Sequence, residues 1–184
     1  MAGVLTGVGY ALFTDTVSMT GIVLGTATPS LKIGVTDPST NEFYFGDTLD
    51  FAAIGHSFKP LVPGGYEWGE FWLKNESDSE KVDFNLTAQI TAHSGNWNVL
   101  KEVVWARICL YENSADHKCG TATEWYTLSD WKDNAKSLPG NPLIANEVPQ
   151  HYVVNFYIAN NVGNEIAGKS ITGMTMEIVG TQVQ

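Results

Sequence analysis

The segment Val82-Asp-Phe-Asn-Leu-Thr-Ala-Gln-Ile-Thr-Ala92 decides the fold class, because its polarity alternates with a period of two residues. The apolar side comprises Val82, Phe84, Leu86, Ala88 and Ile90, and the polar side Asp83, Asn85, Thr87, Gln89 and Thr91. This is the pattern of an antiparallel strand that buries one face and exposes the other to water. We therefore expect Phe84, Leu86 and Ile90 to face a core and Asn85 to face outward.

Five further segments predict strands. Between residues 66 and 74 the polarity alternates again, with Phe71 and Leu73 on the side opposite Tyr66, Trp68 and Trp72. Four runs are rich in β-branched and aromatic residues: Leu31–Val35, Val103–Tyr111, Tyr152–Ile158 and Ser170–Val179. Turn signals rich in Gly, Pro and Asn separate them. The pattern predicts an all-β, two-sheet sandwich with one or two short helices.

The clearest helix signal covers Ser129–Leu138. Ser129 suits the N-cap position, Asp130 lies in the first turn, and Pro139-Gly140 ends the segment. Trp131, Ala135 and Leu138 then share one face of the helix.

Length and charge limit the function. A chain of 184 residues has the length of one domain, and such domains bury about 70% of their unfolded surface. Twenty acidic and ten basic residues give a net charge of −10. Nine of the bases are Lys and one is Arg107, so we expect no nucleic-acid partner. Only 16% of residues are charged, and this composition is typical of a secreted protein.

The two cysteines, Cys109 and Cys119, lie ten residues apart around a polar segment. They are either two buried free thiols or a disulfide, and we expect the disulfide because the composition favours an oxidising compartment. The pair alone offers too few ligands for a metal site. Closing this loop would stabilise the fold by about 2–3 kcal/mol on the chain-entropy model.

The N-terminal segment Met1–Phe13 is apolar, but no positive charge precedes it, and the first Lys is Lys32. We therefore expect no complete signal peptide within this chain. No stretch reaches the ~18 apolar residues of a membrane span, so none is expected.

Signatures of catalysis are missing, so we expect no enzyme activity, metal or cofactor. The four histidines are His56, His93, His117 and His151, in four different segments without a His-Glu-x-x-His pair. We expect His151 to be a solvated histidine at a sheet edge. One cluster of acidic residues lacks the spacing of a calcium-binding loop. We expect it to be a solvated surface, and a weak divalent-cation site is the alternative. Its members are Glu67, Glu70, Glu76, Asp78, Glu80 and Asp83.

Two N-glycosylation sequons begin at Asn75 and Asn85. Asn75 is expected in a turn and Asn85 on the polar face of its strand, so both are accessible candidates; a chance match is the alternative. Four tryptophans have two possible roles: they form a sugar-binding platform, or they pack in the core and at the sheet edges. We favour packing. These are Trp97, Trp105, Trp125 and Trp131.

Three groups of segments occur in an order that carries a family resemblance. The first is Gly9-Tyr-Ala-Leu-Phe-Thr-Asp15, followed by Thr20-Gly21 and Leu31-Lys-Ile33. The second runs from Phe58-Lys-Pro-Leu-Val-Pro-Gly64 to Phe71-Trp-Leu-Lys-Asn75. The third runs from Gly163-Asn-Glu-Ile-Ala-Gly-Lys-Ser-Ile171 to Gly180-Thr-Gln182. Together they resemble the motifs of the camelysin/TasA family of secreted matrix-fibre proteins, which includes archaeal bundling pilins.

The resemblance implies a jelly-roll sandwich, secretion with a removed signal peptide, and an extracellular location at the cell surface or in a biofilm matrix. It covers most of the chain except residues 93–150, whose cysteine loop and Trp-rich inserts depart from the family pattern. In assembled family members an N-terminal strand of one subunit completes the sheet of the next. The implied partners are copies of this chain in a head-to-tail filament and neighbouring filaments in bundles. Some members are described as proteases, but this sequence carries no residue set to support that activity.

Residues 1–15 are accordingly expected to form a donor strand, and residues 16–184 a single sandwich domain. The donor residues are Gly3, Val4, Leu5, Thr6, Val8, Tyr10, Leu12 and Phe13. The alternative is an ordinary first strand of the same domain. The leading hypothesis is a structural subunit of a pilus-like filament or matrix fibre that polymerises by donor-strand complementation. A monomeric cell-surface adhesin or carbohydrate-binding module is the second hypothesis, and a metal-dependent hydrolase the third.

Overall fold

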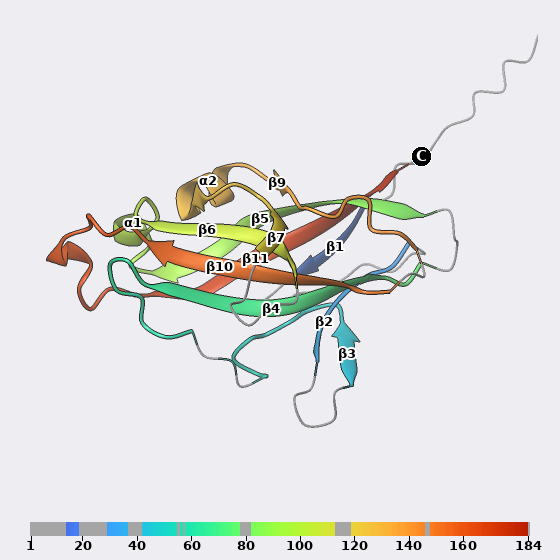
Figure 1. Ribbon diagram of the computed structural model, residues 1–184, viewed down its shortest axis with the longest axis horizontal. Coiled ribbons are helices and arrows are strands. Elements are labelled where there is room, and N and C mark those ends of the chain that lie inside the picture. Colours follow the sequence, from blue (N-terminus) through green and yellow to red (C-terminus); the bar gives the residue numbers. More distant parts are fainter. Residues whose placement is uncertain are drawn as a thin grey trace, which may run out of the picture.

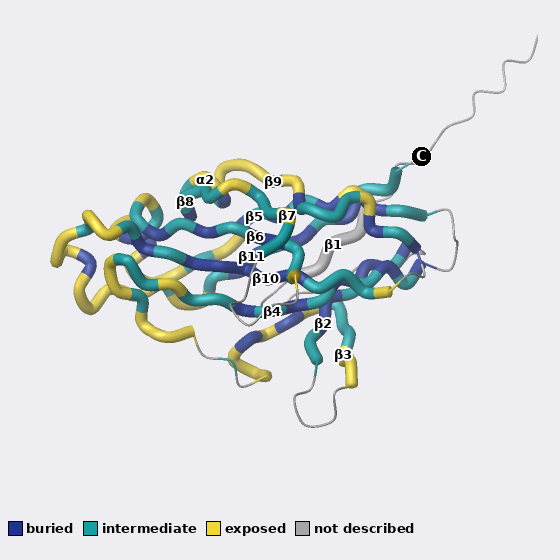
Figure 2. The backbone as a smooth tube through the Cα atoms, in the orientation of Figure 1, coloured by how far each residue is buried: buried dark blue, intermediate teal, exposed yellow. Residues whose placement is uncertain are grey.

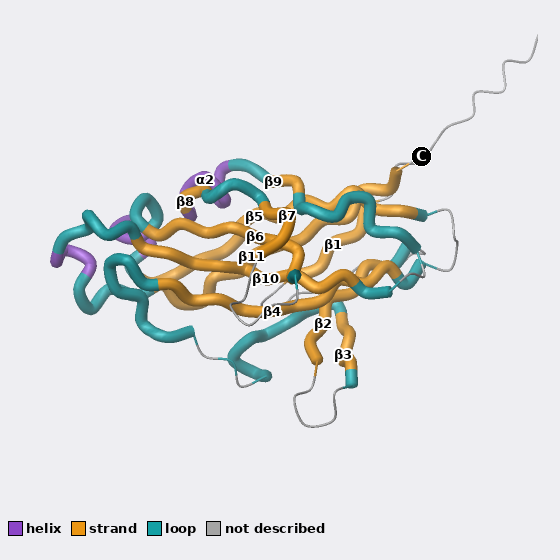
Figure 3. Tube along the Cα trace, viewed as in Figure 1, coloured by secondary structure: helices purple, strands orange, loops and turns teal. Residues whose placement is uncertain are grey.

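The computed structural model describes residues 14–18, 29–36, 42–54, 56, 58–77, 82–112, 119–145 and 148–183. In this part of the chain, two antiparallel sheets stack as a sandwich, with their long strands along the long axis of the molecule (Figure 1). The all-β sandwich predicted from the alternating polarity is therefore confirmed. Short helices lie at the periphery of the sheets (Figure 3).

The smaller sheet has four strands in the order β1-β11-β5-β9. Their bounds are β1 Thr14–Ser18, β11 Ile171–Val183, β5 Asp83–Gly95 and β9 Lys136–Ser137. The two long strands, β5 and β11, form the centre of this sheet, and β1 and β9 form its edges.

Strand β5 has the two faces that its sequence predicts. Phe84, Leu86 and Ile90 are fully buried, whereas Asn85 on the opposite face is exposed. The period of two residues therefore fixes which side of β5 faces the second sheet.

The larger sheet has seven strands in the order β3-β2-β4-β10-β6-β7, with β8 pairing β6 beside this path. Their bounds are β3 Phe43–Gly46, β2 Leu31–Thr36, β4 Tyr66–Asn75, β10 Gln150–Ile158, β6 Val104–Tyr111, β7 Cys119–Ala122 and β8 Tyr126–Thr127. The strands expected from the sequence are present, and the additional ones are short. The hairpin of β2 and β3 projects from the body of the sandwich (Figure 1).

The core fills the space between the sheets. Buried residues follow the middle of the long strands, and exposed residues gather in the loops at their ends (Figure 2). The largest fully buried side chains include Trp131, Tyr152, Phe71, Phe84 and Ile108. Burial of this apolar surface is the main force that holds the two sheets together.

Helix α2, Leu128–Asp133, connects the two sheets, because β8 before it pairs with β6 and β9 after it pairs with β5. The expected helix Ser129–Leu138 is therefore wrong at both ends. Thr127 is the N-cap, since its hydroxyl and the Asp130 carboxylate form a reciprocal capping box. A second short helix, α1, covers Trp97–Leu100, and a 3-10 turn covers Asn164–Ile166.

Strand β1 includes residues on both sides of the expected boundary between residues 15 and 16. Thr14 and Asp15 pair with Thr181 and Gly180 of the chain's own β11, in register with the rest of β1. Both residues therefore belong to the sandwich. The donor residues Gly3 to Phe13 lie outside the described part of the chain.

Candidate functional site

The disulfide predicted from the sequence is present between Cys109 and Cys119, whose Cα atoms lie 5.3 Å apart. Cys109 is fully buried on the outer side of β6, and Cys119 begins β7 beside it. The side-chain amide of Asn155 in β10 lies 3.1 Å from the Cys119 sulfur and 3.4 Å from the Cys109 sulfur. The disulfide thus links the edge strand β7 to its neighbour β6 in the larger sheet.

That outer face is densely aromatic, because strands β4, β10 and β6 alternate large apolar residues inward with rings outward. Phe71 and Leu73 of β4 are buried in the core, so the residues between and before them point away from it. The outward side chains of the three strands include Tyr66, Trp68, Trp72, His151, Tyr157, Trp105 and Tyr111.

At one end of this face, Tyr66, Trp125 and Tyr157 form a group that we call the ring cluster. The Tyr66 and Tyr157 rings stack with centroids 4.7 Å apart. Trp125, which precedes β8, approaches Tyr66 to 6.1 Å and Tyr157 to 6.0 Å between ring centroids. Tyr66 remains 61% exposed, so the cluster is open to solvent.

Arg107, the only arginine of the chain, lies against the ring cluster. Its guanidinium carbon lies 4.6 Å from the centre of the Trp125 ring, a cation–π distance. Its Nε is buried and finds no hydrogen-bond acceptor in the described part of the chain. Within the described residues, Arg107 forms no ion pair with a carboxylate.

At the other end of the face, His151 stacks between two rings. Its ring centroid lies 4.0 Å from that of Trp72 and 4.2 Å from that of Tyr111. Its Nε2 lies 3.1 Å from a carboxylate oxygen of Glu70. The expectation of a solvated edge histidine is wrong, because β10 is flanked on both sides by β4 and β6.

The four tryptophans considered for a sugar platform separate into two pairs. Trp97 and Trp131 are buried, and Trp131 Nε1 donates to the Ala106 carbonyl at 3.0 Å. Trp105 and Trp125 lie on the outer face. Tyr66, Tyr157 and Arg107 also lie at this end of the face, and the sequence alone does not identify them as site residues. The alternating polarity around Tyr66, which turns its ring outward, is the sequence signal that points to this face.

The two sequons differ in accessibility. Asn75 is 1% exposed and ends β4, so its expected place in an accessible turn is wrong. Its amide nitrogen donates to the carbonyls of Val82 and Leu143, and its oxygen accepts from Ser77. The fold therefore leaves no room for a glycan on Asn75, whereas Asn85 is exposed on β5.

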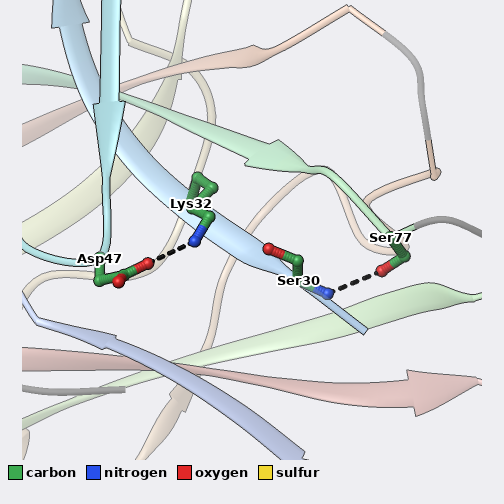
Figure 4. A network of polar contacts seen from close by, with 4 residues as sticks. All are labelled: Ser30, Lys32, Asp47 and Ser77. Atoms are coloured by element: carbon green, nitrogen blue, oxygen red, sulfur yellow. Dashed lines mark hydrogen bonds and ion pairs between the residues drawn. The ribbon is translucent and has the colours of Figure 1, made fainter. Parts of the chain in front are cut away.

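The Asn75 hydrogen bonds belong to a larger junction at the start of β2. The Ser30 backbone N–H donates to Ser77 Oγ at 3.0 Å, which ties the segment before β2 to the segment after β4 (Figure 4). Beside it, Lys32 of β2 forms an ion pair with Asp47 (Figure 4). These contacts give the residues around Asn75 a structural role.

The acidic cluster does not converge in the described part of the chain. Glu70 contacts His151, Glu76 pairs with Lys74 at 2.8 Å, and Asp83 accepts from the Ala145 backbone N–H at 3.1 Å. Asp78 and Glu80 lie outside the described residues. Among the described residues, no group of three or more His, Cys, Asp or Glu side chains is arranged to hold a metal ion.

Comparisons with protein-family models, curated proteins and solved structures returned no match to this chain. In the described part of the chain, no helix is long and apolar enough to cross a membrane.

Proposed function

We propose that this protein is a structural subunit of an extracellular filament, a pilus-like fibre or matrix fibre, in which the N-terminal segment of one copy completes a sheet of the next. One observation carries the proposal: β1 is a short edge strand that the chain enters beside the end of β11. The joint is a β-strand addition, in which backbone hydrogen bonds give affinity and alternate side chains give specificity.

The register of β1 limits what its own sheet offers to the residues before it. Thr14 pairs with Thr181, and β11 ends at Val183. Residues 1–13, which precede Thr14, carry no charged side chain. A straight continuation of β1 would carry the residues before Thr14 toward the end of β11 that follows Thr181. In the proposed joint these residues pair instead with the sheet edge of a second copy.

The apolar character of residues 1–13 supports the same conclusion. Exposed apolar strands and open sheet edges are aggregation hazards, and insertion of one into the other removes both. The joint is heterologous, since the donor segment of one copy meets the acceptor edge of another. Heterologous joints that do not close into a ring form filaments.

The disulfide supports the extracellular location. Disulfides persist in oxidising compartments and are rare in the cytosol, where thiols are kept reduced. Its burial beside Asn155 on the outer face is that of a structural bridge.

Electron microscopy of negatively stained, purified full-length protein tests the proposal. We expect fibres of uniform width built from one subunit per repeat. A protein that remains monomeric at high concentration, with intact disulfide and cooperative unfolding, would instead support the adhesin hypothesis.

A further inference from the structure

The ring cluster and Arg107 form a surface whose chemistry the filament hypothesis does not use. The cluster lies on the outer face of the seven-stranded sheet, whereas β1 belongs to the four-stranded sheet. The inference about the ring cluster does not rest on the proposed function, and either can fail without the other.

Arg107 forms no ion pair with any described carboxylate. Its guanidinium is flanked by the Trp125 ring, and its Nε is buried without an acceptor from those residues. Lys74 on the same face differs, because its ammonium already pairs with Glu76 at 2.8 Å. Because no described carboxylate pairs with Arg107, a ligand carboxylate that reaches its guanidinium gains charge-assisted hydrogen bonds without displacing another anion. The planar fork of a guanidinium can bind a carboxylate through two parallel hydrogen bonds.

The three rings of the cluster place a second requirement on the ligand, which must pack against an aromatic surface. Tyr66 is 61% exposed and lies with Tyr157 and Trp125 beside the guanidinium, so the ring cluster offers an aromatic surface to solvent. The negative face of an aromatic ring attracts weakly positive C–H groups. A pyranose ring offers such a C–H face, and a uronic acid carries a carboxylate on the same ring.

We infer that the ring cluster and Arg107 bind a saccharide that carries a carboxylate. The guanidinium of Arg107 receives the carboxylate, and the rings of Tyr66 and Trp125 pack against the sugar. The net charge of −10 repels polyanions at long range, so the ligand is a saccharide of low charge density rather than a nucleic acid.

Saturation-transfer difference NMR on the full-length protein tests this inference, because it observes weak ligands on monomers and on large assemblies alike. Aromatic protons of the protein are irradiated in the presence of methyl β-D-glucuronide, methyl β-D-glucoside, sodium acetate or the peptide acetyl-Asp-Ser-Glu-amide. We expect saturation of the glucuronide ring protons and about tenfold weaker binding of the glucoside, which lacks the charge-assisted hydrogen bonds.

Variants locate the binding. Arg107→Gln should weaken glucuronide binding about tenfold, and Arg107→Lys should restore only part of it because an ammonium lacks the fork. Tyr66→Ala, at an exposed ring, should reduce the saturation of the sugar protons without loss of the fold. Lys74→Gln is the matched control, since it removes a cation from the same face, and binding should not change.

Four results would overturn the inference. Equal binding of glucuronide and glucoside would remove the role of the carboxylate. Equal binding of acetate would reduce the surface to an anion site without sugar recognition. Tighter binding of the peptide would make it a docking site for an acidic protein. No saturation of any ligand, or none that depends on Arg107 and Tyr66, would leave the cluster without this function.

Discussion

The contact between Phe84 of β5 and Gly180 of β11 offers a double-mutant test of the packing between two neighbouring strands. Phe84 is fully buried, and a Cβ placed on Gly180 would lie 3.0 Å from both Cγ and Cδ1 of the Phe84 ring. The same Cβ would lie 3.3 Å from a methyl carbon of Leu31. Gly180 therefore permits the ring to occupy its position.

Each single substitution should destabilise the protein by a different mechanism. Phe84→Ala removes a core ring and should cost about 3–5 kcal/mol. Gly180→Ala overpacks the same space and should cost about 1–3 kcal/mol. In the double variant the added methyl enters the space that the ring has left, so the loss should be smaller than the sum of the two single losses by about 1–3 kcal/mol.

Urea denaturation followed by tryptophan fluorescence measures these losses, and thermal unfolding gives a second readout. For a chain of this length, each kcal/mol shifts Tm by about 2–4 °C. Asn85→Ala, on the exposed face of β5, and Gly46→Ala, where an added Cβ meets atoms no closer than 3.6 Å, are the controls and should stay within about 0.5 kcal/mol. Additive effects of Phe84→Ala and Gly180→Ala, or equal effects at Phe84 and Asn85, would refute this packing.

Three further predictions concern the disulfide, the Asn75 junction and a buried tyrosine. Alkylation of unreduced protein should modify neither Cys109 nor Cys119 in mass spectra, and reduction should cost about 2–3 kcal/mol in urea denaturation; two alkylated cysteines would disprove the bridge. Asn75→Ala should lower the free energy of unfolding by about 3 kcal/mol in the same assay, because several buried polar groups lose the Asn75 side chain as a hydrogen-bond partner. A loss as small as that of Asn85→Ala would show that the junction contributes nothing. Burial raises the pKa of Tyr152 above its ordinary value near 10, so its stabilising contribution is complete below about pH 10 and falls by about 1.4 kcal/mol per pH unit above it. Tyr152→Phe should flatten the loss of stability between about pH 10 and 11.5, and an unchanged slope would contradict the assignment.

The sequence predicts secondary structure best where a local pattern is compatible with only one structure. The alternation around Phe84 and the ring-bearing alternation around Trp72 predict strands with the correct faces, because a strand must bury one side. The disulfide also followed from local spacing and composition.

The sequence-based predictions are wrong where contacts between distant parts of the chain determine the structure. Ser129 and Thr127 are both suitable N-caps, and the reciprocal bond between Thr127 and Asp130 selects the earlier one. The edge position expected for His151 is wrong because strand order is not readable from β10 alone. In the sequence Asn75 resembles a loop asparagine, whereas in the fold it is buried and bonded to partners as distant as the Leu143 carbonyl.

The ring cluster shows the same limit. Tyr66, Tyr157 and Trp125 come from three separate segments, and the register between β4 and β10 brings the two tyrosines together. Local sequence revealed that Tyr66 points outward, but not which rings it meets.

Deletion of residues 1–13 tests the donor-strand joint most directly. The deletion leaves β1 and its pairing with residues 177–181 of β11 in place, so the truncated subunit should fold, with the disulfide formed and a cooperative urea transition. Sedimentation and electron microscopy, under conditions in which the full-length protein forms fibres, should find no fibres of the truncated subunit. A synthetic peptide of residues 1–13 should bind it, because the acceptor edge is vacant. Normal fibres built from the truncated subunit would contradict the account.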